Sequence, residues 1–276
     1  MKKNKINLHL CCALFATVGV LGGCAKDTSM SNTVADVEEV AAQKKNAKAA
    51  KINTQLGMGY LKQGNTSRAK QKLLMAQEQA PRSPDVAGAL GYYFETTGEM
   101  NQAQRYYLRA LNLAPGKGAQ LNNYGAFLCR QAKYSEAEKY FIRATKDINY
   151  VNSAGAVENA GICALAIPNL ALAKQYFEQA IAQDPQRFNS YYELGKMMLE
   201  AKQYKDSLKW IERYELQNNP LDPRMALLGF RAAEGAGLSK KADGFAWILK
   251  TKFPASKEFK QIASSEAYGK RYTHKG

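Results

Sequence analysis

The sequence has few of the residues on which enzyme active sites depend. It contains two histidines in 276 residues, His9 near the N-terminus and His274 near the C-terminus. It has no Cys-x-x-Cys, His-Glu-x-x-His or EF-hand spacing, and no glycine-rich phosphate-binding loop. These absences argue against a Ser/His/Asp or Cys/His catalytic arrangement, a metal site and a nucleotide site. We therefore expect a protein that is not an enzyme and that has no cofactor, no catalytic residue and no metal ligand.

Acidic residues are also scarce relative to basic ones. The chain has 24 Asp and Glu against 39 Lys and Arg, which gives a formal charge of +15. Such a charge suits nucleic acid, anionic lipid headgroups or an acidic protein. The basic residues are spread along the chain, and no recognition-helix, zinc or stacking-platform motif is present. We therefore expect no nucleic-acid binding. The charge favours an anionic membrane surface or an acidic partner, or is simply solvated helix surface.

The N-terminus has the organisation of a secretory signal. Three lysines precede an apolar stretch, residues 8–21, which has no Asp, Glu, Lys or Arg and is too short for an ordinary membrane span. The stretch runs into the segment LGGC at 21–24, which resembles the bacterial lipobox. We therefore predict a lipoprotein signal peptide over residues 1–23 and a lipidated Cys24. The alternative is an ordinary cleavage site that carries a cysteine. Loss of the three lysines would lower the formal charge to +12.

The segment after the signal, residues 24–49, is expected to hold the lipid anchor, a tether and a leading helix. Residues 25–32 are small and polar, which is typical of a tether. From about Val34 the composition is rich in Ala and Lys and favours a helix. By resemblance to enterobacterial lipoproteins, Ala25 after the lipidated cysteine favours sorting to the outer membrane. We therefore expect a lipid-anchored outer-membrane protein whose folded domain faces the periplasm.

One stretch of the chain, residues 83–115, sets a pattern that recurs. A first helix carries Leu and Phe on one face, and a second helix carries small and aromatic residues at helical spacing. Gly91 leaves room for the second helix to cross closely, and Gly98 makes the turn between them. The pattern resembles the tetratricopeptide repeat (TPR), a helix pair with a period of about 34 residues. Its defining positions here are Leu90, Gly91, Phe94, Ala103, Tyr107, Ala110 and Pro115.

The same pattern recurs along the chain from about residue 50 to about residue 255. We therefore predict an all-α fold, a right-handed α-solenoid of about six TPRs; an unrelated bundle of helical hairpins is the alternative. Two extra residues enter the connector after the third repeat. The last segment, 256–276, should form a capping helix, with Ser256 at its N-terminus, and a basic tail. The repeats, numbered one to six, are 50–83, 84–117, 118–153, 154–187, 188–221 and 222–255.

Two cysteines remain beyond the predicted lipidation site. Cys129 and Cys163 lie on the first helices of repeats three and four. Packed helix axes about 8–10 Å apart bring facing Cα atoms to roughly 4–6 Å, which suits a disulfide. We therefore predict a disulfide that joins the two repeats. Two buried free thiols are the alternative.

The first helices of successive TPRs line a concave surface that can hold an extended or helical peptide. Exposed apolar and aromatic side chains on such a surface suit protein recognition. We expect this surface to bind a protein partner, although several of its residues could instead pack between repeats. The candidate residues are Met58, Leu61, Tyr92, Glu95, Asn122, Ala126, Arg130, Glu158, Ile162 and Tyr192.

Two segments make the pattern more specific. The lipobox, about six TPRs, LNNYGAFLC at 121–129 and ENAGICAL at 158–165 together resemble the type IV pilus biogenesis lipoprotein family called PilF or PilW. The resemblance implies an outer-membrane pilotin that binds the secretin subunit of the type IV pilus through its TPRs. It also implies a role in secretin multimer assembly and twitching motility, and a Cys129–Cys163 disulfide. We expect a monomer.

Two other functions fit part of the pattern. One is a TPR scaffold lipoprotein of another envelope assembly, such as tight-adherence secretion or cell-wall synthesis. The other is a structural lipoprotein that binds peptidoglycan and has no protein client. The paired cysteine segments favour the pilus family over the first, and sedimentation with purified sacculi in the absence of secretin would support the second.

Overall fold

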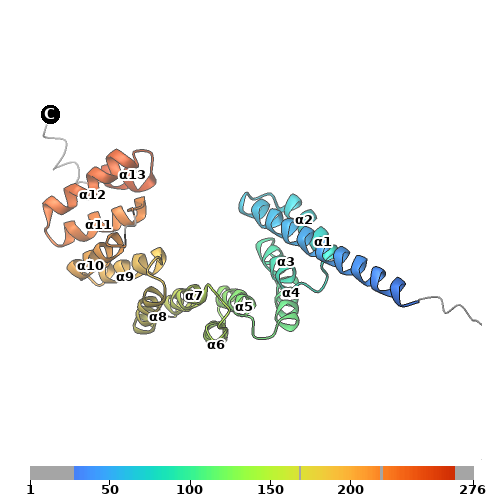
Figure 1. Ribbon diagram of the computed structural model, residues 1–276. Coiled ribbons are helices and arrows are strands. Elements are labelled where there is room, and N and C mark those ends of the chain that lie inside the picture. Colours follow the sequence, from blue (N-terminus) through green and yellow to red (C-terminus); the bar gives the residue numbers. More distant parts are fainter. Residues whose placement is uncertain (1–27, 168, 218–219, 265–276) are drawn as a thin grey trace, which may run out of the picture. The chain divides into compact units, whose positions relative to one another are not determined.

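The computed structural model describes residues 28–167, 169–217 and 220–264, and within them every regular element is an α-helix (Figure 1). The chain divides into two compact units, Met1–Lys45 and Asn46–Gly276, each of which is considered by itself. In the described ranges no helix combines the length and the apolar character needed to span a bilayer. The predicted all-α architecture is confirmed.

The first helix, α1 (Thr28–Lys62), is longer than the sequence predicted. The expected tether over residues 25–32 is wrong from Thr28 onward, because this part is helical. No glycine or proline occurs between Cys24 and Leu56. Ala, Lys, Gln and Glu, which dominate the stretch, are strong helix formers, so nothing local ends the helix earlier. Cys24 itself lies outside the described residues.

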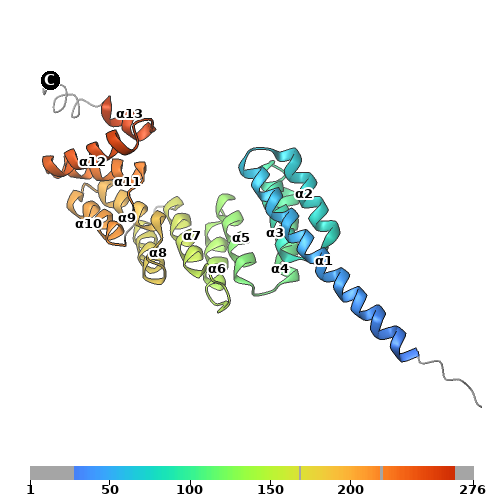
Figure 2. The ribbon, with the colours of Figure 1, turned by 45° about the horizontal axis from the view of Figure 1, so that its top comes forward.

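Helix pairs follow one another along the second unit, and each predicted repeat contains one pair (Figures 1 and 2). Each pair from repeat two to repeat five packs against the next pair along the chain. Because an isolated pair leaves apolar surface open, stacking of neighbours is what buries the core. The pairs are α1 with α2 (Thr66–Gln79), α3 (Pro84–Thr96) with α4 (Met100–Leu113), α5 (Gly118–Arg130) with α6 (Tyr134–Ala144), α7 (Ser153–Ala166) with α8 (Leu170–Gln183), α9 (Phe188–Glu200) with α10 (Tyr204–Glu215), and α11 (Pro223–Gly235) with α12 (Ser239–Lys252).

The recurring glycines of the first helices sit where the second helix crosses. A Cβ added at Gly91 would lie 2.9 Å from the ring of Tyr107, and one added at Gly125 would lie 2.9 Å from the ring of Phe141. Both rings are fully buried. Any larger residue would push the aromatic ring away, so the predicted packing role of these glycines is confirmed.

The longest connector between pairs, residues 145–152 between α6 and α7, folds back on the start of α5. The Gly118 N–H donates to Asp147 Oδ2 at 2.7 Å, and the ring of Tyr150 packs directly on Gly118. The backbone donors of Gly118 and then Asn149 hold the pKa of the Asp147 carboxyl below its usual value. The connector with the two extra residues is therefore an ordered part of this interface.

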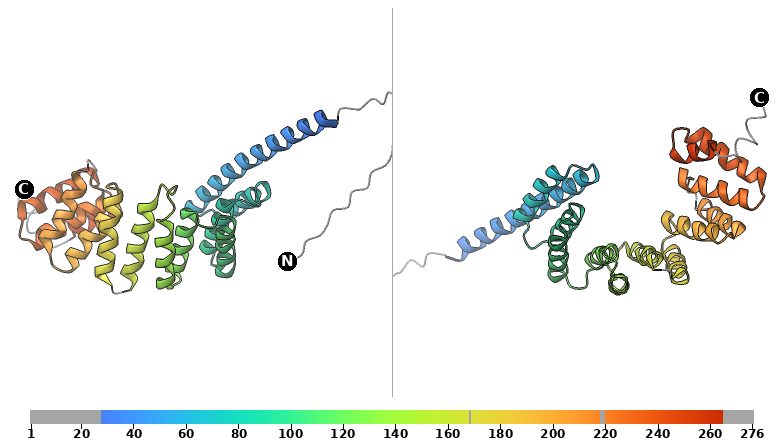
Figure 3. Two further views of the ribbon diagram at one scale, coloured as in Figure 1. Left: turned by 60° about the horizontal axis from the view of Figure 1, so that its bottom comes forward. Right: turned by 180° about the vertical axis from the view of Figure 1, so that it is seen from behind.

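The last helix, α13 (Lys257–Ala263), covers α11 and α12 (Figure 3). The Phe259 N–H donates to Ser256 Oγ at 3.0 Å, which caps the helix as the sequence predicted. Ile262 is fully buried, and Phe259 packs against the same core. The expected cover of the last pair is confirmed, and the basic tail lies outside the described residues.

Candidate functional site

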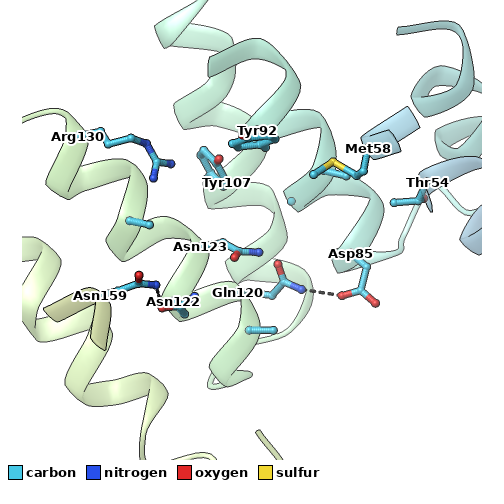
Figure 4. A pocket seen from close by; sticks show the side chains of 14 residues that line it. Thr54, Met58, Asp85, Tyr92, Tyr107, Gln120, Asn122, Asn123, Arg130 and Asn159 are labelled. Atoms are coloured by element: carbon cyan, nitrogen blue, oxygen red, sulfur yellow. Dashed lines mark hydrogen bonds between the residues drawn. The ribbon is translucent and has the colours of Figure 1, made fainter. Parts of the chain in front are cut away.

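A cavity of about 480 Å³ opens among the first helices of the first four pairs (Figure 4). Met58 comes from α1, Tyr92 from α3, and Asn122, Ala126 and Arg130 from α5. Five of the ten candidate residues therefore line one cavity. Its other lining residues are Thr54, Asp85, Gly88, Ala89, Tyr107, Ala119, Gln120, Asn123 and Asn159.

The structure buries three candidates. Asn122 is 8% exposed but still lines the cavity, whereas the other two require correction. Leu61 is 7% exposed and belongs to the hydrophobic core of the first pairs. Glu158 is 7% exposed, and its Oε2 accepts hydrogen bonds from the Ser190 N–H at 3.1 Å and the Ser190 hydroxyl at 2.8 Å. Ser190 lies in the first turn of α9, whose N-cap position holds Arg187 and has no side-chain cap. Glu158 thus satisfies a free helix N–H from the neighbouring repeat and is not available to a partner.

Glu95, another candidate, forms a charged bridge at one end of the cavity. Its Oε2 lies 2.8 Å from Arg130 Nη2, and it also accepts a hydrogen bond from the Tyr107 hydroxyl at 2.9 Å. The bond with Glu95 raises the pKa of Arg130. Burial, followed by the Glu95 charge, raises the pKa of Tyr107. The bridge ties α3, α4 and α5 together and neutralises the one arginine that lines the cavity.

The remaining two candidates lie outside this cavity. Ile162 is 44% exposed on α7. Tyr192 stacks with Phe188 on α9 at a centroid distance of 6.0 Å. The Arg224 guanidinium lies over both rings, 4.6 Å from the Phe188 centroid and 5.5 Å from that of Tyr192. Tyr192 therefore belongs to a separate aromatic and cationic cluster shared by α9 and α11.

Of the four side-chain amides of the cavity, the sequence interpretation named Asn122 and missed Gln120, Asn123 and Asn159. Gln120 Nε2 donates to Asp85 Oδ1 at 2.7 Å, and Asn159 Nδ2 donates to Asn122 Oδ1 at 2.9 Å. Asn123, on the same helix as Asn122, is exposed towards the cavity. The only available signal was the density of amides in the first turns of α5, because helical periodicity identifies the core face and does not distinguish a groove from open surface.

The structure joins Cys129 of α5 to Cys163 of α7 in a disulfide, with Cα atoms 5.8 Å apart. The bond links α5 and α7, two helices that also contribute Arg130 and Asn159 to the cavity. In the described residues no group of three or more His, Cys, Asp or Glu side chains is placed to hold a metal ion.

Comparison with known proteins identifies the family. Residues 54–118, 128–186 and 158–223 match the tetratricopeptide repeat family model. The type IV pilus assembly protein PilF of Pseudomonas aeruginosa is 30% identical over 234 residues, which are 85% of this chain and 92% of that protein.

Two solved structures are similar over most of the chain. A structure of Pseudomonas aeruginosa PilF is 30% identical with a TM-score of 0.62, covering 79% of this chain and 98% of that one. A crystal structure of PilW, described as a widely conserved type IV pilus biogenesis factor, is 26% identical with a TM-score of 0.65, covering 78% and 98%. The resemblance found in the sequence is confirmed. This chain is a tetratricopeptide-repeat protein that belongs to the PilF/PilW family of type IV pilus biogenesis proteins.

Proposed function

We propose that this chain is an outer-membrane lipoprotein pilotin of the type IV pilus. It binds the secretin subunit through its TPRs and promotes the localisation of secretin to the outer membrane and its assembly into multimers. The observation that carries the proposal is the 30% identity with PilF across 92% of that protein. Such coverage relates the whole TPR array to a type IV pilus assembly protein, rather than a single repeat.

The lipid anchor would supply localisation. Two or three acyl chains on Cys24 give stable membrane attachment, where a single chain would be marginal. A secretin subunit bound to the anchored protein is held at a high effective concentration next to the membrane in which it assembles. This role needs binding and placement, and no bond in the partner has to be made or broken.

The cavity is suited to binding rather than to catalysis. Its arginine is paired with Glu95, and Asp85 accepts a hydrogen bond from Gln120. Titratable groups held in this way are less able to exchange protons with a substrate. The lining combines amides, small residues and the apolar side chains of Met58 and Tyr92. These are features of a surface that recognises a polypeptide.

The decisive experiment is deletion of the gene in the producing bacterium. We expect heat-resistant secretin multimers to fall strongly on denaturing gels, with loss of twitching motility, and both to return on complementation. A Cys24→Ala variant should fold and still bind secretin but leave it in the wrong membrane fraction. Unchanged multimer amount and location after deletion would refute the proposal and favour another envelope assembly as the client.

A further inference from the structure

The strongest feature outside the assigned roles is an unpaired polar atom in the wall of the cavity. Gln120 is 3% exposed, and its Oε1 is buried without a hydrogen-bond partner in the described part of the chain. The Asp85 carboxylate can only accept, so it fixes the Gln120 amide with Nε2 towards Asp85 and leaves Oε1 without a donor. Figure 4 shows this oxygen beside Asn123, on the cavity side of α5. A native protein rarely leaves such an acceptor unsatisfied, which indicates a donor supplied from outside.

Three further amides extend from this point across α5 to α7. Asn122 and Asn159 use one oxygen and one amino group in their mutual bond. Their other groups, the Asn122 amino group and the Asn159 oxygen, have no hydrogen bond to another described residue. Asn123 makes none at all in that part of the chain and is exposed. We call Gln120, Asn122, Asn123 and Asn159 the amide row.

The chemistry of the amide row selects one kind of ligand. It offers donors and acceptors side by side, whereas an anion needs donors and a cation needs acceptors. The cavity's arginine is paired with Glu95, and the charge that remains is the exposed Asp85 carboxylate at its edge, which does not suit an anion. A peptide main chain presents one N–H and one C=O per residue and matches such a mixture. An extended peptide leaves these groups free, since no helix or sheet occupies them.

The shape of the cavity supports the same ligand. Ala89, Ala119 and Ala126 contribute to its lining with little side-chain bulk, so a main chain can approach the helices there. Gly88 itself has no room for a side chain, because an added Cβ would lie 2.9 Å from Gln120 Oε1. Tyr92 is 41% exposed and offers an apolar contact for an alternate side chain of the ligand.

We propose that the amide row captures an extended, non-helical segment of the protein partner by hydrogen bonding to its main chain. The inference rests on the proposed function, which makes that partner the secretin subunit. The amide row binds mainly the backbone of this segment, and Met58 and Tyr92 contribute limited selectivity for its side chains.

The first test uses the full chain purified in detergent and overlapping synthetic peptides that span the secretin subunit. Asn123→Ala should weaken the best-binding peptide about 3-fold to 10-fold, as expected for the loss of one or two hydrogen bonds. Its thermal unfolding temperature should not fall, because Asn123 makes no hydrogen bond within the described residues and alanine is the better helix former. Asn112→Ala is the matched control, an exposed asparagine on α4 outside the cavity, and should bind as the parent does.

The second test separates backbone capture from side-chain recognition. Gln120→Met keeps the side-chain volume, removes both the unpaired oxygen and the bond to Asp85, and should weaken the same peptide by a similar factor; Asp85→Asn, which keeps the oxygen of Gln120, is its control. A peptide with alternate amides N-methylated should lose at least about 10-fold in affinity, whereas a peptide of permuted sequence should keep most of it. If the permuted peptide fails and the N-methylated one binds normally, main-chain capture is wrong.

Two outcomes distinguish this inference from the function on which it rests. If secretin co-purifies with the full chain and with the Asn123 and Gln120 variants equally, the cavity is not the binding site, although the pilotin role stands. If the full chain captures no secretin peptide and instead sediments with purified peptidoglycan sacculi in an Asn123-dependent manner, the amide row binds glycan. Both the inference and the proposed partner would then be wrong.

Discussion

Repeats three and four differ from repeats five and six in what joins one helix pair to the next. Between α5 and α7 there is a disulfide and the Asn122–Asn159 hydrogen bond. Between repeats five and six, Arg224 lies over two aromatic rings of α9, and Lys241 pairs with Glu212 at the surface. In a solenoid each interface has to be stable by itself. The covalent interface is the one that borders the candidate site, whereas the other is held by packing and non-covalent polar contacts.

This difference indicates where precision is required. A disulfide restricts the unfolded chain as well as the folded one, so repeats three and four should open together or not at all. An interface of stacked rings and an exposed ion pair, which contributes little, can open locally at lower cost. We therefore expect hydrogen exchange to be slower in α5–α8 than in α9–α12, and the following changes test that expectation.

The largest effect is expected from Phe141→Ala in repeat three. The ring is fully buried against Gly125, and its loss leaves a cavity at the crossing of α5 and α6. The free energy of unfolding should fall by about 3–5 kcal/mol, measured by urea denaturation. Ile142→Ala, at the neighbouring exposed position, is the control and should change it by less than about 1 kcal/mol. Equal losses for the two variants would contradict the packing described for this pair.

Removal of the disulfide should come next. The Cys129→Ala, Cys163→Ala double variant opens a covalent loop of about one repeat, and chain entropy predicts a loss of about 3–4 kcal/mol. Hydrogen exchange should accelerate in α5–α8 and change little in α9–α12. Intact mass of the parent chain should increase by two hydrogens on reduction, and no increase would show that the two thiols are free.

A smaller effect is expected at Glu158, which joins repeat four to repeat five. Glu158→Ala leaves the Ser190 N–H and hydroxyl without their acceptor, at a cost of about 1–3 kcal/mol. Glu158→Gln keeps an acceptor and should lose less. Exchange of the Ser190 amide reports the change directly. Glu178→Ala, an exposed glutamate on α8, is the control; if it destabilises as much, Glu158 does not act as a cap for α9.

The helix pairs were predictable because their signals are local and repeated. Small residues, glycines and aromatics recur in phase, and stacking of copies is then the only way to bury them. The start of α1 was not predictable from the composition of residues 28–32. These residues are mostly small and polar, but they precede a segment rich in strong helix formers, and the helix extends back through them. An amphipathic pattern identifies the helix face that packs in the core. Where a helix has no such face, as at the start of α1, the pattern does not show where the helix begins.

The candidate site was predictable only in part, for a different physical reason. Periodicity placed Met58 and Tyr92 on the correct face, but it placed Glu158 there too. The Glu158 carboxylate is in fact hydrogen-bonded to Ser190, 32 positions later, at the start of the next repeat's first helix. Gln120 and Asn123 were missed because polar residues on a first helix look alike until the neighbouring repeat is present. Contacts between repeats, rather than within them, decide which polar groups remain free.

The smallest effect concerns the turn inside each pair, which should be alike in the two regions. Ala132 in repeat three and Lys202 in repeat five have φ values of 58° and 59°, where Gly98 stands in repeat two. A side chain there is strained, so Ala132→Gly and Lys202→Gly should each stabilise the chain by roughly 0.5–1 kcal/mol after the entropy of the unfolded state is counted. Urea midpoints measure this.

Two alanine substitutions give the control for the turn, because they should act with opposite signs. Gly98→Ala should destabilise, whereas Gly59→Ala, inside α1 with open space around it, should stabilise by a similar amount. If Ala132→Gly and Lys202→Gly gain equally, the turns of the two regions are equivalent and their difference lies in the interfaces between pairs. A gain confined to Lys202 would mean instead that the turn of repeat three is held in place by the disulfide-linked helices beside it.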